Sequence, residues 1–167
     1  MSPLEIAQAM EASPFGTALR ESRYGFPGLI FVHLCGLLIT AGTVFLWDLR
    51  LLGVGLRSTP VSRVGQALLP WTWSGFCIML LTGSAMVCME AGRLYPNTAF
   101  RVKLALLILA GVNMLTFHAT VYRSVGRWDR DAVVPTRARV AGAISLVLWF
   151  ALLTAGRAIG YTINYGD

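Results

Sequence analysis

Long stretches without aspartate, glutamate, lysine or arginine dominate the pattern along this chain. Four of them lie at residues 24–47, 64–89, 104–122 and 140–161, and only the last is interrupted, by Arg157 near its end. A membrane-spanning helix needs about 20 predominantly apolar residues. A long arginine side chain near a helix end can reach the headgroup region. The pattern therefore predicts an all-α protein built as a bundle of four transmembrane helices.

The segment before the first apolar stretch has a different character. Ser2 is followed three residues later by Glu5, which is the form of a helix capping box. Apolar residues then recur along one side of the segment, and such a pattern is typical of a short amphipathic helix lying on a membrane. We expect two parts, namely an N-terminal interfacial segment, residues 1–23, and a four-helix transmembrane domain, residues 24–161.

Composition and charge support the same class of protein. The chain has 167 residues, of which 56% are hydrophobic and only 13% are charged, whereas soluble domains average about 25% charged residues. The net charge of +6 does not indicate a nucleic-acid partner, because the basic residues lie in short clusters between the apolar stretches.

The basic residues also predict an orientation. Eight of them fall in the loops after the first and third spans, and six fall on the opposite side. The positive-inside rule then places both termini on the periplasmic side of a bacterial inner membrane, with the lipid bilayer as the surrounding partner.

The two histidines carry the main functional hypothesis. His33 and His118 both lie inside predicted spans, where an ionisable side chain points to function. They belong to the first and third spans, which run in the same direction, and two imidazoles can be the axial ligands of a b-type haem. We expect haem b held by His33 and His118, electron transfer within the membrane, and a quinol or redox protein partner.

Other residues fit this haem hypothesis. Gly36 and Gly111 lie on the same helical faces as His33 and His118, where small residues let a porphyrin approach the backbone. Lys103 and Arg157, near the outer helix ends, can pair with haem propionates or with anionic lipid. From the span midpoints His33 lies about 4 Å outward and His118 about 7 Å inward, which is a wide offset for one iron.

The alternative is a non-enzymatic transporter, channel or assembly subunit with structural or proton-gating histidines. No carboxylate falls inside the four predicted stretches, which argues against an acidic proton relay, and Asp48 is expected to pair with Arg50. Small residues in every span favour tight helix packing and a homo-oligomer. These residues are Gly36, Gly42, Gly75, Gly83, Gly111 and Gly142. Whether the chain is an enzyme, such as an oxidoreductase component, stays open, and no catalytic residue is assigned.

Several motifs taken together resemble an uncharacterised family of small bacterial four-span membrane proteins. The resemblance covers about residues 20–161 and implies four helices and both histidines, without an assigned activity. The layout is also similar to that of four-helix b-type cytochromes. The segments that carry the resemblance are residues 33–36, 48–53, 71–76, 82–83, 100–103, 113–118 and 156–161.

Overall fold

Four long helices make up most of the structure. The computed structural model describes residues 1–130 and 133–165. Each long helix is long and apolar enough to cross a membrane, which confirms the predicted all-α transmembrane bundle. These helices are α3 (Gly25–Leu52), α4 (Val61–Leu94), α5 (Thr98–Thr120) and α7 (Thr136–Tyr165). The shorter elements are α1 (Pro3–Glu11), α2 (Pro14–Glu21), the 3₁₀ helix Tyr122–Ser124 and α6 (Val125–Trp128).

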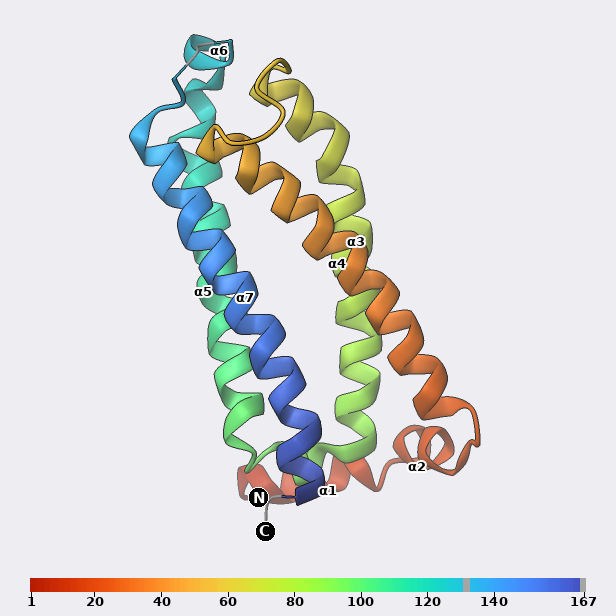
Figure 1. The fold of residues 1–167 in the computed structure, drawn as a ribbon. Coiled ribbons are helices and arrows are strands. Elements are labelled where there is room, and N and C mark those ends of the chain that lie inside the picture. Colours follow the sequence, from red (N-terminus) through yellow and green to blue (C-terminus); the bar gives the residue numbers. More distant parts are fainter. Residues whose placement is uncertain (131–132, 166–167) are drawn as a thin grey trace.

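The long helices are arranged as two pairs. Helix α3 packs along α4, α5 packs along α7, and the contact between α3 and α7 joins the two pairs (Figure 1). Helices α4 and α5 follow one another in the chain, yet they make almost no backbone contact. The bundle is therefore closely packed on three sides and loosely packed on the fourth.

All four long helices extend beyond at least one of their predicted ends, and α3 and α5 show why. Helix α3 continues past Trp47 through Asp48, whose side chain is only 2% exposed, and ends at Gly53, which has a φ of 73°. Helix α5 begins more than a turn before residue 104, because the Asn97 side chain accepts a hydrogen bond from the Phe100 N–H at 3.0 Å. The burial of Asp48 and the cap at Asn97 therefore place one end of α3 and one end of α5 outside the stretches predicted from hydropathy alone.

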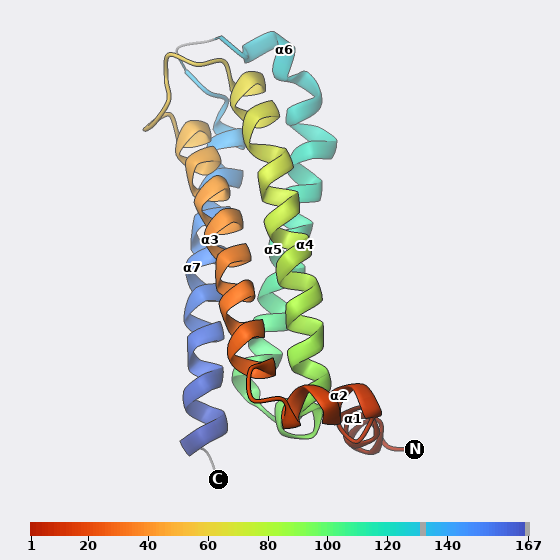
Figure 2. The same ribbon diagram turned by 90° about the vertical axis from the view of Figure 1, so that its right-hand side faces the viewer.

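The N-terminal segment contains two short helices where the sequence predicted one. The predicted capping box is present, since Ser2 and Glu5 exchange backbone-to-side-chain hydrogen bonds of 2.8 and 3.2 Å. A second cap at Ser13, followed by Pro14, starts α2. Both helices lie across one end of the long helices, at the end where α7 also terminates (Figure 2). Their position on a membrane surface stays a prediction.

These two short helices are tied to a break in α4. Glu90 has non-helical dihedral angles, with φ −137° and ψ 31°. Beside it, the Glu11 carboxylate accepts a hydrogen bond from the Gly92 N–H at 2.8 Å, and Arg20 donates one to the Met89 carbonyl at 3.1 Å. The N-terminal helices therefore supply partners to backbone groups on both sides of the break.

A small apolar core closes the other end of the bundle. It brings together the ends of α3, α4, α5 and α7 with α6. The Asp129 carboxylate accepts hydrogen bonds from the Ser62 N–H and hydroxyl, each at 2.7 Å, and so fixes the loop before α7 to the start of α4. The buried members of this core are Leu51, Val61, Phe117, Trp128, Val134 and Ala138.

Candidate functional site: a cavity between the membrane helices

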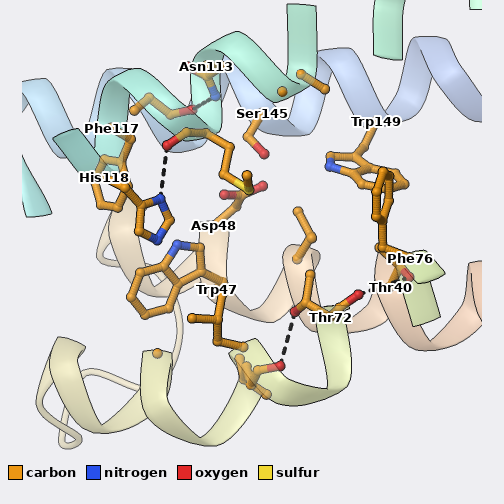
Figure 3. Close-up of a pocket in the computed structure, with 18 of the residues that line it drawn as sticks. Thr40, Trp47, Asp48, Thr72, Phe76, Asn113, Phe117, His118, Ser145 and Trp149 are labelled. Atoms are coloured by element: carbon orange, nitrogen blue, oxygen red, sulfur yellow. Dashed lines mark hydrogen bonds between the residues drawn. The ribbon is translucent and has the colours of Figure 1, made fainter. Parts of the chain in front are cut away.

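The loosely packed side of the bundle contains a partly enclosed cavity of about 180 Å³. All four long helices line it, and it separates α4 from α5. It extends from the middle of the bundle toward the end that carries α6, and Figure 3 shows the side chains around it. Because the lining comes from helices that would cross a membrane, the cavity lies inside the transmembrane domain.

Aromatic rings form much of the cavity wall. Near the α6 end, the Trp47 ring lies 6.3 Å from the Phe117 ring and 6.0 Å from the Tyr122 ring, measured between centroids. Farther along, the rings of Trp73 and Phe76 meet edge to face at 5.9 Å. Trp149 of α7 adds another ring, so aromatic groups stand at both ends of the cavity.

Most polar side chains in the wall already have partners within the bundle. The Thr40 hydroxyl donates to the Gly36 carbonyl at 2.9 Å, and the Thr72 hydroxyl donates to the Leu68 carbonyl at 3.0 Å. The Asn113 amide donates to the backbone of α7 at 3.1 Å, which agrees with its expected role between helices. These groups therefore hold the helices together and leave the cavity surface largely apolar.

Asp48 is the exception. Among the buried side-chain nitrogen and oxygen atoms of the described residues, Asp48 Oδ2 is the one without a hydrogen-bond partner. The Ser145 hydroxyl hydrogen-bonds to the Asp48 carboxylate, and Figure 3 shows the carboxylate directed into the cavity. A buried polar atom without a partner costs free energy, so it calls for an explanation in terms of function.

Two expectations about Asp48 are wrong. The expected pair with Arg50 does not form, because Arg50 Nε donates to the Thr59 carbonyl at 2.9 Å instead. The spans also do contain a carboxylate, since α3 carries Asp48 inside the bundle. The sequence feature that relates to the burial of Asp48 is Gly142. Because Gly142 has no side chain, α7 can approach the Asp48 backbone, and an added Cβ would lie 3.3 Å from the Asp48 carbonyl oxygen.

His118 lies on the cavity wall, at the α6 end. Its Nδ1 lies 2.9 Å from the Met114 carbonyl oxygen. A carbonyl only accepts hydrogen bonds, so Nδ1 carries a proton and donates it to the Met114 carbonyl. Phe117 and Tyr122 pack against the ring at centroid distances of 5.3 and 5.2 Å. The imidazole is thus held firmly in one orientation.

His33 lies away from the cavity, between α3 and α4. Its Nδ1 is 2.8 Å from the Thr82 hydroxyl oxygen, and that hydroxyl donates to the Ile78 carbonyl at 2.7 Å. Its ring also contacts the backbone of Gly83, where a Cβ would lie 3.4 Å from the His33 Cε1. His33 therefore serves the packing of α3 on α4.

The six residues expected to bind haem do not converge. Gly111 and His118 line the cavity, but Gly36 packs against α4, where a Cβ would lie 2.9 Å from the Gly75 carbonyl oxygen. Lys103 lies against Gly156 of α7, with its Nζ 3.8 Å from a Cβ placed there.

The remaining member of the set is exposed. Arg157 donates to the Tyr161 hydroxyl at 2.8 Å, with its guanidinium 4.6 Å from the centre of that ring.

A bis-histidine haem does not fit this arrangement. His118 packs on Tyr122, whose ring meets that of Trp47 at 6.0 Å. Trp47 follows His33 on α3 by almost four turns, which is about 21 Å of helix rise. The offset exceeds the value expected from the sequence because α3 ends later, and α5 begins earlier, than the hydrophobic stretches indicated. One iron cannot take both imidazoles.

Metal-ligating side chains do not gather elsewhere in the described part of the chain. No group of three or more histidine, cysteine, aspartate or glutamate side chains is placed to hold a metal ion there. At the cavity, Asp48 and His118 are the two side chains of these types in the lining. The site is therefore better described as an apolar cavity with a carboxylate than as a metal centre.

Comparisons with known proteins identify the family but not an activity. The model of DUF6644, a family of unknown function, matches residues 24–162, so the chain belongs to that family. Searches of curated proteins and of solved structures found no significant match.

Proposed function

We propose that this member of DUF6644 is a non-enzymatic membrane transporter whose substrate site is the cavity between its four long helices. The observation that carries the proposal is the cavity itself, about 180 Å³ of space inside a bundle of membrane-long helices. Ligand sites in bundles are commonly built in this way, from side chains on facing helices. The sequence left open a transporter, a channel or an assembly subunit. Of these three classes, a transporter is the one that uses an internal cavity to hold its substrate.

The size and lining of the cavity indicate its substrate. An engineered apolar protein cavity of about 150 Å³ binds benzene. The cavity of this bundle is slightly larger and lined mainly by aromatic and aliphatic side chains. A porphyrin is larger than the drug-sized ligands that fill pockets of about 300 Å³ and more. We therefore propose a small substrate of about one ring in size.

The helix arrangement supports a route by which the substrate enters the cavity and a motion of the helix pairs that changes access to it. The cavity separates α4 from α5, so a molecule dissolved in the bilayer can enter between these helices. The two pairs, α3–α4 and α5–α7, meet through the contact of α3 with α7. Rocking of one pair against the other about that contact would change access to the cavity, as in transporters that move rigid bundles around a fixed site.

We place the protein in a bacterial inner membrane with both termini on the periplasmic side. The support is the count of eight basic residues at the α6 end of the bundle against six at the other. Labelling of single introduced cysteines with a membrane-impermeant reagent in intact cells tests this orientation. Labelling at the α6 end, but not near the N-terminus, would reverse it.

Homo-oligomerisation stays a prediction. Several glycines expected to pack helices are already used within one chain, because Cβ atoms on Gly36, Gly75 and Gly142 would all meet neighbouring helices at under 3.4 Å. An added Cβ on Gly42 would meet nothing within 4 Å. Of the two α3 glycines expected to pack helices, Gly36 and Gly42, it is therefore Gly42 that is open to contact with another molecule.

A matched pair of glycine variants tests the proposed site. Gly111 lines the cavity and an added Cβ meets nothing within 4 Å, so we expect Gly111→Leu to occupy cavity volume. Gly42→Leu makes the same change on α3, outside the cavity. Binding of tert-butylbenzene is followed through the fluorescence of Trp47, Trp73 and Trp149, which line the cavity.

We expect saturable binding in the wild type and in Gly42→Leu, and at least about tenfold weaker binding in Gly111→Leu, since the side chain occupies the ligand volume. Equal binding by both variants would overturn the proposed site.

A further inference from the structure

We infer that the substrate is a small organic cation and that the Asp48 carboxylate is its counter-charge. This inference rests on the proposed function and specifies its substrate. The carboxylate is 2% exposed, lines the cavity, and leaves Oδ2 without a partner in the described part of the chain. A cationic group in the cavity supplies that missing partner.

Within the part of the chain that the structure describes, no lysine or arginine stands beside Asp48 in the cavity wall to fill this role. The nearby Arg50 is committed to the Thr59 carbonyl. The Nδ1–H of His118 is directed to the Met114 carbonyl and not to Asp48. A carboxylate inside a membrane bundle is costly unless it is paired or functional, so the charge balance favours a cationic ligand.

The aromatic walls fit the same ligand. A cation is attracted to the face of a tryptophan, tyrosine or phenylalanine ring within about 6 Å of its centre, and more strongly where water is excluded. Trp47 stands toward one end of the cavity with the Tyr122 ring beside it, and Trp149 stands toward the other end. Phe76, near Trp149, has the Trp73 ring beside it. A cation beside Asp48 therefore has aromatic rings around it as well as the opposite charge.

Two probes of the same shape separate charge from size. Phenyltrimethylammonium carries a permanent positive charge, and tert-butylbenzene replaces its nitrogen by carbon. Both are about one ring in size, so either fits an apolar cavity of this volume. A difference in their binding to the wild type measures the contribution of charge without any mutation.

The experiment measures the affinity of both probes for the purified full chain in lipid nanodiscs, using tryptophan fluorescence. We expect the wild type to bind phenyltrimethylammonium at least about tenfold more tightly than tert-butylbenzene. Asp48→Asn keeps the shape and an acceptor for Ser145, and should lose this preference while still binding tert-butylbenzene. Glu90→Gln removes a carboxylate from α4 outside the cavity lining and should leave both affinities unchanged.

The outcomes separate the two proposals. If both probes bind the wild type equally, or Asp48→Asn keeps its preference for the cation, the cation inference is wrong and the cavity stands as an apolar site. If neither probe binds the wild type, the proposed site fails as well. Should Asp48→Asn not fold, Trp149→Leu is the second variant, and it should weaken the binding of the cation more than that of the neutral probe.

Discussion

His33 and His118 are held in different parts of the bundle, since His118 lies near Trp47 through the Tyr122 ring, and Trp47 follows His33 on α3 by about 21 Å of helix rise. Each ring hydrogen-bonds through Nδ1, His33 to the Thr82 hydroxyl and His118 to a backbone carbonyl. His33 fills a contact between α3 and α4, whereas His118 stands at the wall of the cavity. The two rings therefore have separate roles, and only His118 can meet a ligand in the cavity.

This separation predicts the absorption spectrum of the protein. Expressed with ample haem and purified, the wild type should show no Soret band and no sharp α band after reduction with dithionite, because one iron cannot reach both imidazoles. His33→Ala and His118→Ala should give the same featureless spectrum. A Soret band that either substitution abolishes would restore haem ligation and contradict the separation.

The close crossing of α3 and α4 predicts a sensitive glycine. A Cβ on Gly75 would lie 2.7 Å from the Gly36 carbonyl oxygen and would also meet the Thr40 side chain. Gly75→Ala should therefore lower the free energy of unfolding by about 1–3 kcal/mol through overpacking. Thermal unfolding in detergent measures this change in stability. Gly111→Ala is the control, because its Cβ meets nothing within 4 Å, and it should leave stability unchanged or raise it.

The contact between Glu11 and Gly92 predicts how the N-terminal helices are held. Glu11→Ala removes the acceptor of the Gly92 N–H and a partner of Arg20, which lies 3.5 Å away. We expect a loss of about 1–2 kcal/mol and faster hydrogen exchange at Gly92 and in α1 and α2. Glu21→Ala, at the end of α2, is the matched control. Unchanged exchange at Gly92 in Glu11→Ala would show that the contact does not hold α1 in place.

Asp129 predicts a dependence of stability on pH. Burial alone would raise the pKa of its carboxyl, but the hydrogen bonds from Ser62, together with Arg130 and Arg50, lower it below the ordinary value of 3.8. A lowered pKa in the folded state stabilises the protein above that ordinary value, and the stabilisation is lost as the pH falls through the folded-state pKa. The wild type should lose stability as the pH falls below the ordinary value of 3.8, more steeply than Asp129→Asn. Unfolding midpoints at several pH values measure this, and parallel curves would contradict it.

The hydrophobic pattern was sufficient for the fold. Four apolar stretches became four long helices, and the Ser2–Glu5 capping box is present as predicted. These features depend on residues close together in the sequence, and so they can be predicted from it. The helix ends were less predictable, because α3 passes through a charged residue that tertiary packing buries.

The site was only partly predictable for the same reason. His118 and Gly111 were singled out and do line the cavity. Asp48 was taken for a residue at the end of a helix, because its burial depends on Gly142, far away in the sequence. The sparse backbone contact between α4 and α5 also depends on residues far apart in the sequence, so no local pattern predicts the cavity.

Uptake into proteoliposomes measures transport by the protein itself. The measurement is the initial rate of labelled phenyltrimethylammonium uptake by vesicles containing the wild type, Gly111→Leu or Gly42→Leu, with protein-free vesicles as the baseline. We expect saturable uptake well above the baseline for the wild type and Gly42→Leu, and uptake near the baseline for Gly111→Leu. Equal rates in all four preparations would contradict the transport of an organic cation through the cavity.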